Sequence, residues 1–103
     1  MKLLIIIMFI ISSFAYSQDL ASGKKLYKKC MSCHGADGYG KKSQKAPMIA
    51  GQYEWYLKAQ ITNIRDQKRV SGNSKKMYAM VKGLKDEHVA DLAAYIATLP
   101  LRR

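Results

Sequence analysis

Disulfide-forming cysteines and long apolar runs are both scarce in this sequence. Its 103 residues include two cysteines, and they stand three positions apart. A bond between them would close almost no loop, so a disulfide-stapled secreted scaffold is excluded. The longest apolar run, residues 3–11, is well short of the ~20 residues that a membrane-spanning helix needs. No repeat, heptad run or low-complexity tract is present, and the length allows one small domain.

The N-terminal stretch has the features of a secretory signal peptide. Lys2 precedes the apolar run, and small residues follow at Ala15 and Ser17. We predict cleavage after Ser17, with cleavage after Ala15 as the second choice. Residues 1–17 are then the signal peptide and residues 18–103 the folded domain. Export predicts a location in the periplasm, and retention of the segment as a membrane anchor is the alternative.

Acidic residues are also few, with 7 against 18 basic ones and a formal net charge of +11. Nucleic acid is the usual partner of so basic a small protein. Export argues against that partner, because chromosomal DNA and RNA lie on the other side of the membrane. We expect electrostatic steering toward acidic proteins or anionic lipid surfaces. A merely solvated basic surface is the simpler alternative.

The motif Cys30-Met31-Ser32-Cys33-His34 is the attachment signature of a c-type haem. On one helical turn, positions i, i+3 and i+4 share a face, so both sulfur atoms can bond one porphyrin while the histidine reaches the iron. A domain this small usually needs stabilisation beyond its hydrophobic core, and a covalently bound haem would provide it in place of disulfides. A zinc site built from Cys30, Cys33, His34 and His88 is an alternative, but it would need a second closely spaced pair of ligands, which the sequence lacks. A thioredoxin-like redox pair would need the cysteines to follow a strand and open a helix, and the sequence shows no strand pattern there.

The mature region reads as three helices joined by polar loops, and it shows no strand pattern. The first helix is expected from Asp19, its N-cap, into the haem motif, and the second over residues 52–68. The third is expected from about Asp86 to Pro100. Residues 71–76 read as a flexible, turn-rich linker. The predicted fold class is all-α.

Two positions on these helices stand out. Gly23 costs about 1 kcal/mol relative to alanine inside a helix, so we expect it to let another helix approach closely. Trp55 lies off the apolar face of the second helix, which we assign to Tyr53, Tyr56, Leu57, Gln60, Ile61 and Ile64. It could flank a haem propionate or a docking surface, but an ordinary half-exposed side chain is the simpler interpretation.

The sequence offers candidates for both axial ligands of the haem iron and for the residue that orients His34. Metal-bound histidines need an acceptor for the second ring nitrogen, and the Pro47 carbonyl is a candidate partner of His34; a plain loop proline is the alternative. His88 stands at the start of the last helix, where a solvated side chain is expected. For the second axial ligand the residues alone leave Met77 and Met80 open, with the other one in the core.

The chain resembles a known family, the small class I cytochromes c of bacteria, of the cytochrome c553 and single-domain c4-like kind. The likeness lies in GKKLYKKC (residues 23–30), CHGADG (33–38), APMIAGQ (46–52) with the following Tyr56, Leu57 and Gln60, and DLAAYI (91–96). It implies a small cytochrome c fold with three main helices around one covalently bound haem c.

The resemblance also implies that His34 and a methionine bind the iron and that the Pro47 carbonyl holds His34. In c553-like sequences the ligand stands eight residues before the serine of a Ser-Asp-Glu helix start. That register selects Met77 and leaves Met80 as the runner-up. Lys85 occupies the serine position, so we expect Asp86 to cap the last helix.

These features predict a one-electron carrier, not an enzyme. The alternative is a haem-based peroxidase or gas sensor with an open iron position. We expect a ring of lysines around the exposed haem edge, formed by Lys41, Lys42, Lys45, Lys75 and Lys76, and fast, weak docking on acidic redox proteins. By resemblance, the donor is a quinol-oxidising cytochrome complex and the acceptor a terminal oxidase or peroxidase. Membrane contact is expected only peripherally, or through a retained signal segment.

Overall fold

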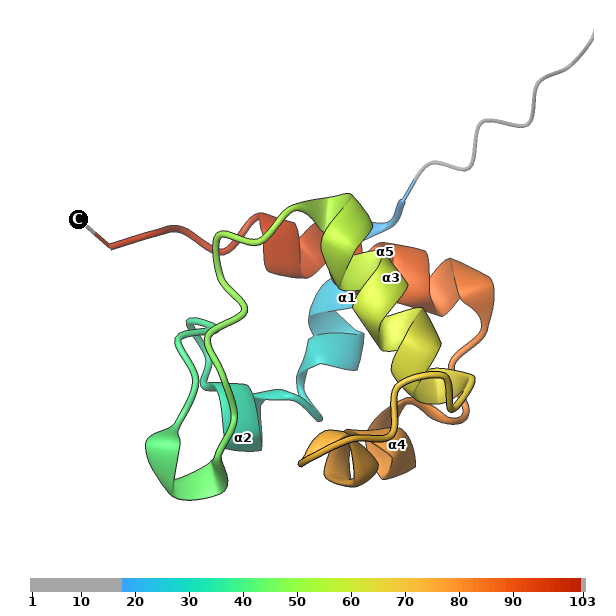
Figure 1. The fold of residues 1–103 in the computed structure, drawn as a ribbon. Coiled ribbons are helices and arrows are strands. Elements are labelled where there is room, and N and C mark those ends of the chain that lie inside the picture. The colour runs from blue at the N-terminus through green and yellow to red at the C-terminus, as the bar shows by residue number, and fades with distance from the viewer. Residues whose placement is uncertain (1–17, 103) are drawn as a thin grey trace, which may run out of the picture.

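The computed structural model describes residues 18–102, and the regular structure in that range is helical, joined by loops (Figure 1). Its elements are α1 (Leu20–Tyr27), α2 (Met31–His34), the short 3-10 helix η1 (Lys42–Gln44), α3 (Glu54–Arg65), α4 (Ser74–Val81) and α5 (Asp86–Ala97). The described residues contain no strand, and Lys41 and Ala46 form one isolated bridge. The predicted all-α class is confirmed. The predicted signal peptide, residues 1–17, lies outside the described residues.

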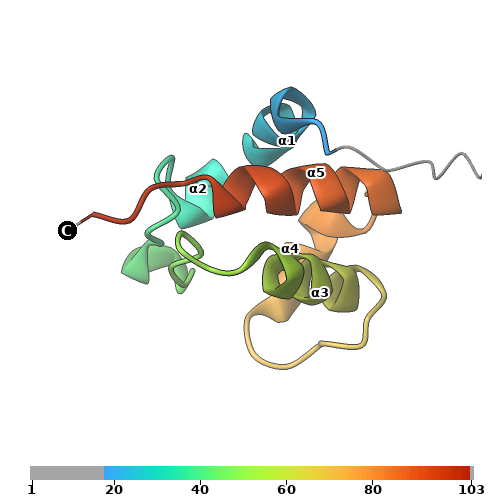
Figure 2. The same ribbon diagram turned by 90° about the horizontal axis from the view of Figure 1, so that it is seen from above.

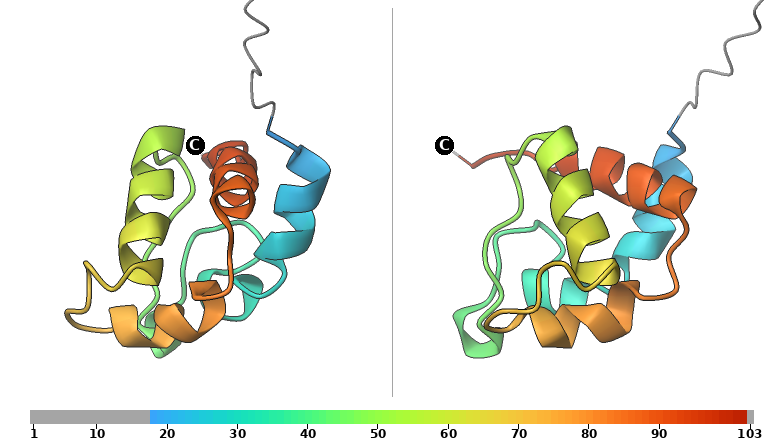
Figure 3. Two further views of the ribbon diagram at one scale, coloured as in Figure 1. Left: turned by 90° about the vertical axis from the view of Figure 1, so that its right-hand side faces the viewer. Right: turned by 45° about the vertical axis from the view of Figure 1, so that its right-hand side comes forward.

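Helix α5 is the centre of the arrangement. It runs between α1 and α3 (Figure 2), and α2 and the following loop lie below its C-terminal end in the view of Figure 1. Helix α4 lies across the end of α3 and contacts it, and α1 packs on the other side of α5 (Figure 3). No helix within residues 18–102 is long and apolar enough to cross a membrane.

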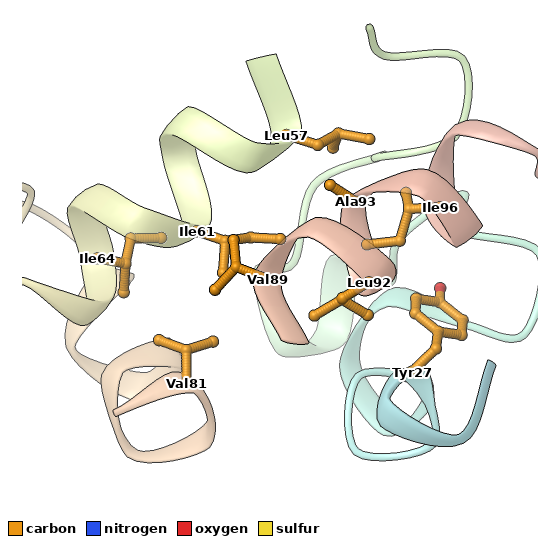
Figure 4. Packing of buried hydrophobic residues seen from close by; sticks show 9 residues of the cluster. All are labelled: Tyr27, Leu57, Ile61, Ile64, Val81, Val89, Leu92, Ala93 and Ile96. Atoms are coloured by element: carbon orange, nitrogen blue, oxygen red, sulfur yellow. The ribbon is translucent and has the colours of Figure 1, made fainter. Parts of the chain in front are cut away.

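The core lies where these helices face one another (Figure 4). It contains one buried aromatic residue from α1 and aliphatic residues at helical spacing from α3, α4 and α5. Its members are Tyr27, Leu57, Ile61, Ile64, Val81, Val89, Leu92, Ala93 and Ile96. The apolar periodicity of α3 and α5 therefore predicts the buried face, except at the start of α3, where Tyr53 and Tyr56 are exposed.

The crossing of α1 and α5 depends on Gly23, as its position in the sequence suggested. A Cβ atom at Gly23 would clash with the main-chain oxygen of Asp91 and lie 2.7 Å from Cβ of Tyr95. Asp19 caps α1 by accepting a hydrogen bond from the Ser22 N–H at 3.1 Å. The Asp19 N–H also donates to the Asp91 carboxylate at 2.8 Å, which ties the start of α1 to α5.

The first helix is shorter than predicted. It ends at Tyr27, and residues 28–30 form a turn before α2. The N–H groups of Lys28 and Cys30 donate to carbonyls three residues back, Lys25 at 3.3 Å and Tyr27 at 2.8 Å. Such bonds tighten and end an α-helix, so the haem motif has a short helix of its own.

The predicted linker and the predicted cap of the last helix also need correction. Helix α4 begins at Ser74, so only residues 71–73 of the supposed linker are turn-like, and lysine, methionine and alanine then favour a helix. Lys85, not Asp86, occupies the N-cap position of α5. The Asp86 carboxylate instead pairs with Arg65 at 2.8 Å, on the neighbouring helix α3. That helix ends at Arg65, earlier than predicted, and the left-handed Gln67 (φ 57°) prevents its continuation.

Candidate functional site

The cysteine–histidine motif forms one compact turn. Cys30 occupies the N-cap position of α2, and its carbonyl accepts the His34 N–H at 2.8 Å. Gly35 ends the helix with φ 81°, a conformation that favours glycine. Cys30, Cys33 and His34 all line the same cavity. The i, i+3, i+4 spacing therefore brings the three side chains to one space.

His34 is held in a defined orientation at this cavity. Its side chain is buried, with 5% of the residue exposed, and Nδ1 lies 2.8 Å from the Pro47 carbonyl oxygen. A carbonyl can only accept, so Nδ1 carries the proton and donates it. The lone pair is then on Nε2, the nitrogen left for a metal ion.

The loop that carries Pro47 is fixed by main-chain hydrogen bonds. The Gly40 N–H donates to the His34 carbonyl at 2.8 Å, and the Gly38 carbonyl accepts the N–H groups of Ile49 at 2.7 Å and Ala50 at 3.0 Å. Gly40 has φ 83°, and a Cβ there would lie 2.7 Å from the Pro47 carbonyl carbon. The loop thus brings Pro47 back beside the helix that carries His34.

Tyr27 is a supporting residue whose role the sequence did not indicate. Its hydroxyl donates to the Gly35 carbonyl at 2.6 Å, which joins α1 to the end of α2. Burial, with smaller contributions from Cys30 and Tyr95, raises the pKa of Tyr27 to about 12. The hydroxyl therefore stays protonated and remains a donor at any physiological pH.

The cavity beside the motif has a volume of about 720 Å³. That value lies within the range of about 300–1,000 Å³ usual for cofactor and ligand pockets. The walls come from α2, the Pro47 loop, α3, α4 and α5, and include the apolar side chains of Ile49, Leu57, Ile61, Ile64, Val81, Leu92 and Ile96. A flat, largely apolar cofactor with a metal at its centre fits this combination of volume, apolar walls and one oriented histidine.

Methionines line the cavity on more than one side. Met48 follows Pro47 on the histidine side, and Met77 and Met80 both come from α4. Met77 is half-buried against the core, whereas Met80 is 51% exposed. Met31, inside the motif, is not among the lining residues.

His88 does not line the cavity. Its Nδ1 accepts the Lys85 N–H at 3.2 Å at the start of α5. Among the described residues, no group of three or more His, Cys, Asp or Glu side chains could hold a metal ion. Burial, followed by the influence of Cys33, raises the pKa of the Cys30 thiol to about 11, the opposite of the shift that activates a catalytic thiolate.

Cationic side chains also reach the cavity. Lys45 and Lys76 from the predicted lysine ring line it, together with Lys29 and Arg69, which were not predicted. Lys41, Lys42 and Lys75 are not lining residues. The Arg69 guanidinium donates to the Gln60 side-chain oxygen at 2.8 Å, so it is held against α3.

Comparison with known proteins agrees with this site. The family model for cytochrome c matches residues 20–100. Cytochrome c-554(548) of Halomonas halodenitrificans is 40% identical over 80 residues, which are 78% of this chain and 95% of that protein. Cytochrome c4 of Pseudomonas aeruginosa is 39% identical over 80 residues, 78% of this chain and 38% of that longer protein. Cytochrome c-553 of Nitratidesulfovibrio vulgaris is 28% identical over 102 residues, 96% of this chain and 100% of that protein.

The resemblance inferred from the motifs is therefore confirmed. Members of this family carry covalently attached haem c and transfer electrons rather than catalyse a reaction on a substrate. The buried histidine, the paired cysteines and the apolar cavity are the features that such a haem requires. The chain belongs to the cytochrome c family, as a class I c-type cytochrome.

Proposed function

We propose that this protein is an exported, periplasmic electron carrier with one haem c. Cys30 and Cys33 would attach the haem, and His34 and Met77 would ligate its iron. The observation that carries the proposal is the hydrogen bond from His34 Nδ1 to the Pro47 carbonyl, at the edge of the cavity that both cysteines line. It leaves Nε2 with its lone pair, as an iron ligand needs.

Residues of the chain would provide orientation, insulation and covalent attachment. When bound, haem supplies an iron that alternates between the ferrous and ferric states. The Pro47 carbonyl keeps the His34 ring in one tautomer and one orientation. The apolar walls from α3 and α5 would exclude water from the haem and so limit reorganisation around its iron. Two permanent axial ligands would leave no open position for a substrate, in contrast to a peroxidase or gas sensor.

Burial supports Met77 over Met80 as the second ligand. Both line the cavity from α4, but Met77 packs against the core, whereas Met80 is 51% exposed and does not. A thioether bound to iron must lie in a defined place, and a half-buried side chain loses less conformational freedom on binding. The register of c553-like sequences selects Met77 as well.

The positive charge supports weak docking on acidic redox proteins. Lys29, Lys45 and Lys76 at the cavity would form the inner part of a basic docking surface, with other lysines farther out. By family resemblance we propose a quinol-oxidising cytochrome complex as donor and a terminal oxidase or peroxidase as acceptor. The proposed signal peptide, residues 1–17, would direct the chain to the periplasm where such partners meet.

Absorption spectroscopy of the exported, haem-loaded protein tests the ligand assignment. We expect the spectrum of a thioether-linked c haem and, in the oxidised protein, the methionine-to-iron charge-transfer band. Met77→Ala should abolish this band, and the matched variant Met80→Ala should keep it. A band that survives Met77→Ala and disappears in Met80→Ala would show that Met80 is the ligand. An oxidised wild-type protein without the band would contradict His/Met ligation altogether.

A further inference from the structure

An exposed group of aromatic side chains lies at the start of α3. Tyr53 is 73% exposed, Trp55 68% and Tyr56 40%. The rings of Tyr53 and Trp55 are stacked, with centroids 6.1 Å apart and planes 16° from parallel. Trp55 and Tyr56 meet edge to face at 5.9 Å and 87°. The rings thus hold one another in place, and most of the surface of Tyr53 and Trp55 remains open to solvent.

The core of the protein does not account for these rings. Leu57, Ile61 and Ile64 make the buried face of α3, and neither Tyr53 nor Trp55 belongs to the core cluster or the residues packed on it. Tyrosine and tryptophan are enriched at protein interfaces, where a large rigid ring contributes area at a small entropic cost. Mutual stacking reduces that cost further, since the rings are already ordered before a partner arrives.

The aromatic group is continuous with the edge of the haem cavity. Tyr56 lines the cavity, as does Met48, which is also exposed. We call Met48, Tyr53, Trp55 and Tyr56 the aromatic patch. A protein bound over this patch would cover the rim of the cavity in which Cys30, Cys33 and His34 lie, which is where a short route for an electron would run.

Charge indicates what kind of partner fits. Between residues 45 and 58 the chain has Lys45 and Lys58 but one acidic residue, Glu54. Lys45 shares the cavity wall with Met48, whereas Lys58, one helical turn after Trp55 on α3, lines a second pocket with Asp86 and Glu87. Lys45 is therefore the cation on the cavity side of the patch. With a net charge of +11, two copies of the chain repel each other, so self-association over this patch is disfavoured. An acidic protein surface is attracted instead.

We propose that the aromatic patch is the docking site for an acidic redox protein, with Trp55 and Tyr53 as its main contact residues. This inference rests on the proposed electron-carrier function and adds the surface through which it acts. The apolar rings would provide the specific contact, and the net positive charge of the chain, with Lys45 at the cavity side of the patch, would bring the acidic partner to it.

The test uses the haem-loaded protein and an acidic blue-copper protein as the redox probe. Stopped-flow absorbance would give the second-order rate constant of electron exchange for the wild type, for Trp55→Ala and for the double variant Tyr53→Ala/Trp55→Ala. We expect the double variant to lose about tenfold in rate, the loss typical of removing interface anchors. Leu20→Ala, which truncates an exposed side chain on α1 at the other side of α5, is the matched control and should keep the wild-type rate.

A binding measurement gives a second readout. Trp55 is the one tryptophan in the sequence, so the protein has a single indole N–H signal in its NMR spectrum. This signal should shift when the reduced protein is titrated with the reduced copper protein. The same signal is then titrated with vesicles of anionic phospholipid, because aromatic and basic side chains also gather at membrane interfaces.

The outcomes separate the inference from the function on which it rests. Unchanged rates in the double variant, or an indole signal that moves with vesicles and not with the copper protein, would overturn the docking site. An equal loss of rate with ferricyanide would overturn it too, because the haem site itself would then be damaged. A wild-type protein that exchanges no electrons with ferricyanide would instead refute the proposed function.

Discussion

At the scale of single residues, several important side chains in this protein bind main-chain oxygens. His34 donates to the Pro47 carbonyl, Tyr27 to the Gly35 carbonyl, and Arg65 to the Leu84 carbonyl at 3.1 Å. Arg65 is the most elaborate case, because its guanidinium also pairs with Asp66 at 2.9 Å and with Asp86 at 2.8 Å. It thereby joins the end of α3 to the connection between α4 and α5, next to the helix that carries Met77.

The Arg65–Asp66 pair predicts a specific pH dependence. The hydrogen bond from Arg65 lowers the pKa of Asp66 below its usual value of 3.8. A carboxyl group whose pKa is lower in the folded protein than in the unfolded one stabilises the fold above pH 3.8, and this contribution is lost as the pH falls through the folded pKa. We expect Asp66→Asn to be less stable than the wild type at pH 7 and equally stable at the acid end.

Urea unfolding of both proteins over pH 7 to about pH 2.5 measures this difference. At about 1 M NaCl the two curves should approach each other, because an exposed ion pair is screened. Stability curves that stay parallel down to the lowest pH would show that the pair contributes nothing to folding.

At the scale of elements, helices α1 and α5 pack closely because Gly23, at their crossing, has no side chain. Gly23 brings the α1 backbone against the main chain at Asp91 and against Tyr95. The hydrogen bond from the Asp19 N–H to the Asp91 carboxylate lies at the same crossing. A close approach of this kind stabilises both helices through packing, although glycine lowers the intrinsic helix propensity of α1.

Gly23→Ala should therefore destabilise the protein despite its better helix propensity. The new methyl group would clash with the Asp91 carbonyl oxygen, and overpacking costs about 1–3 kcal/mol. The gain in propensity is at most about 1 kcal/mol. We expect a lower melting temperature, measured by circular dichroism, in the haem-loaded protein.

Gly83→Ala is the control for this substitution. A Cβ at Gly83 meets nothing within 4 Å, so the methyl group should leave the melting temperature nearly unchanged. Equal effects of the two substitutions would mean that backbone freedom, and not the α1–α5 crossing, explains the result at Gly23.

Helical periodicity predicts most of this architecture, because buried positions recur along α3 and α5 at the spacing expected of an amphipathic helix. Leu57, Ile61 and Ile64 on α3 and Val89, Leu92 and Ile96 on α5 are buried as that spacing requires. Periodicity misplaced Tyr53, which is the N-cap residue of α3 and lies beyond the surface that covers the rest of the helix. Tyr56 is partly exposed but lines the cavity with the other residues of the predicted face. Periodicity also missed α4, whose eight residues are too few to show a period.

The site divides in the same way. The cysteines and His34 follow from a local motif, whose geometry is that of one helical turn. The contacts from Arg65 to the Leu84 carbonyl and the Asp86 carboxylate join residues far apart in the sequence and depend on how the helices meet. No spacing within a single segment carries that information, so the sequence alone did not indicate them. The rings of Tyr53, Trp55 and Tyr56 are neighbours in the sequence, but their stacking depends on side-chain conformation, which helical spacing does not give.

At the scale of the whole molecule, charge is the dominant property. The chain carries 18 basic and 7 acidic residues, and several of the basic side chains line the cavity that would hold the haem. A field of this kind acts over distances longer than a contact and raises the rate of encounter with a partner of opposite charge. It does so without making the complex long-lived, which suits repeated electron exchange.

Electron exchange with an acidic redox protein should therefore slow as salt is added. The Debye length falls from about 30 Å at 0.01 M to about 8 Å at 0.15 M ionic strength. We expect the second-order rate constant, measured by stopped flow, to fall by at least about tenfold over this range. With a neutral redox reagent the rate should stay constant, and a salt-independent rate with the acidic protein would refute electrostatic steering.

The central position of α5 has a consequence for the order of events during synthesis. Helix α1 packs on a helix that begins more than 60 residues later, and α3 packs on the same one. A chain that is made from its N-terminus cannot close this core until its last segment has emerged. Cys30 and Cys33 have emerged well before that and are still in an unfolded segment. The topology thus leaves an interval in which both thiols can react with a haem before the chain folds around them.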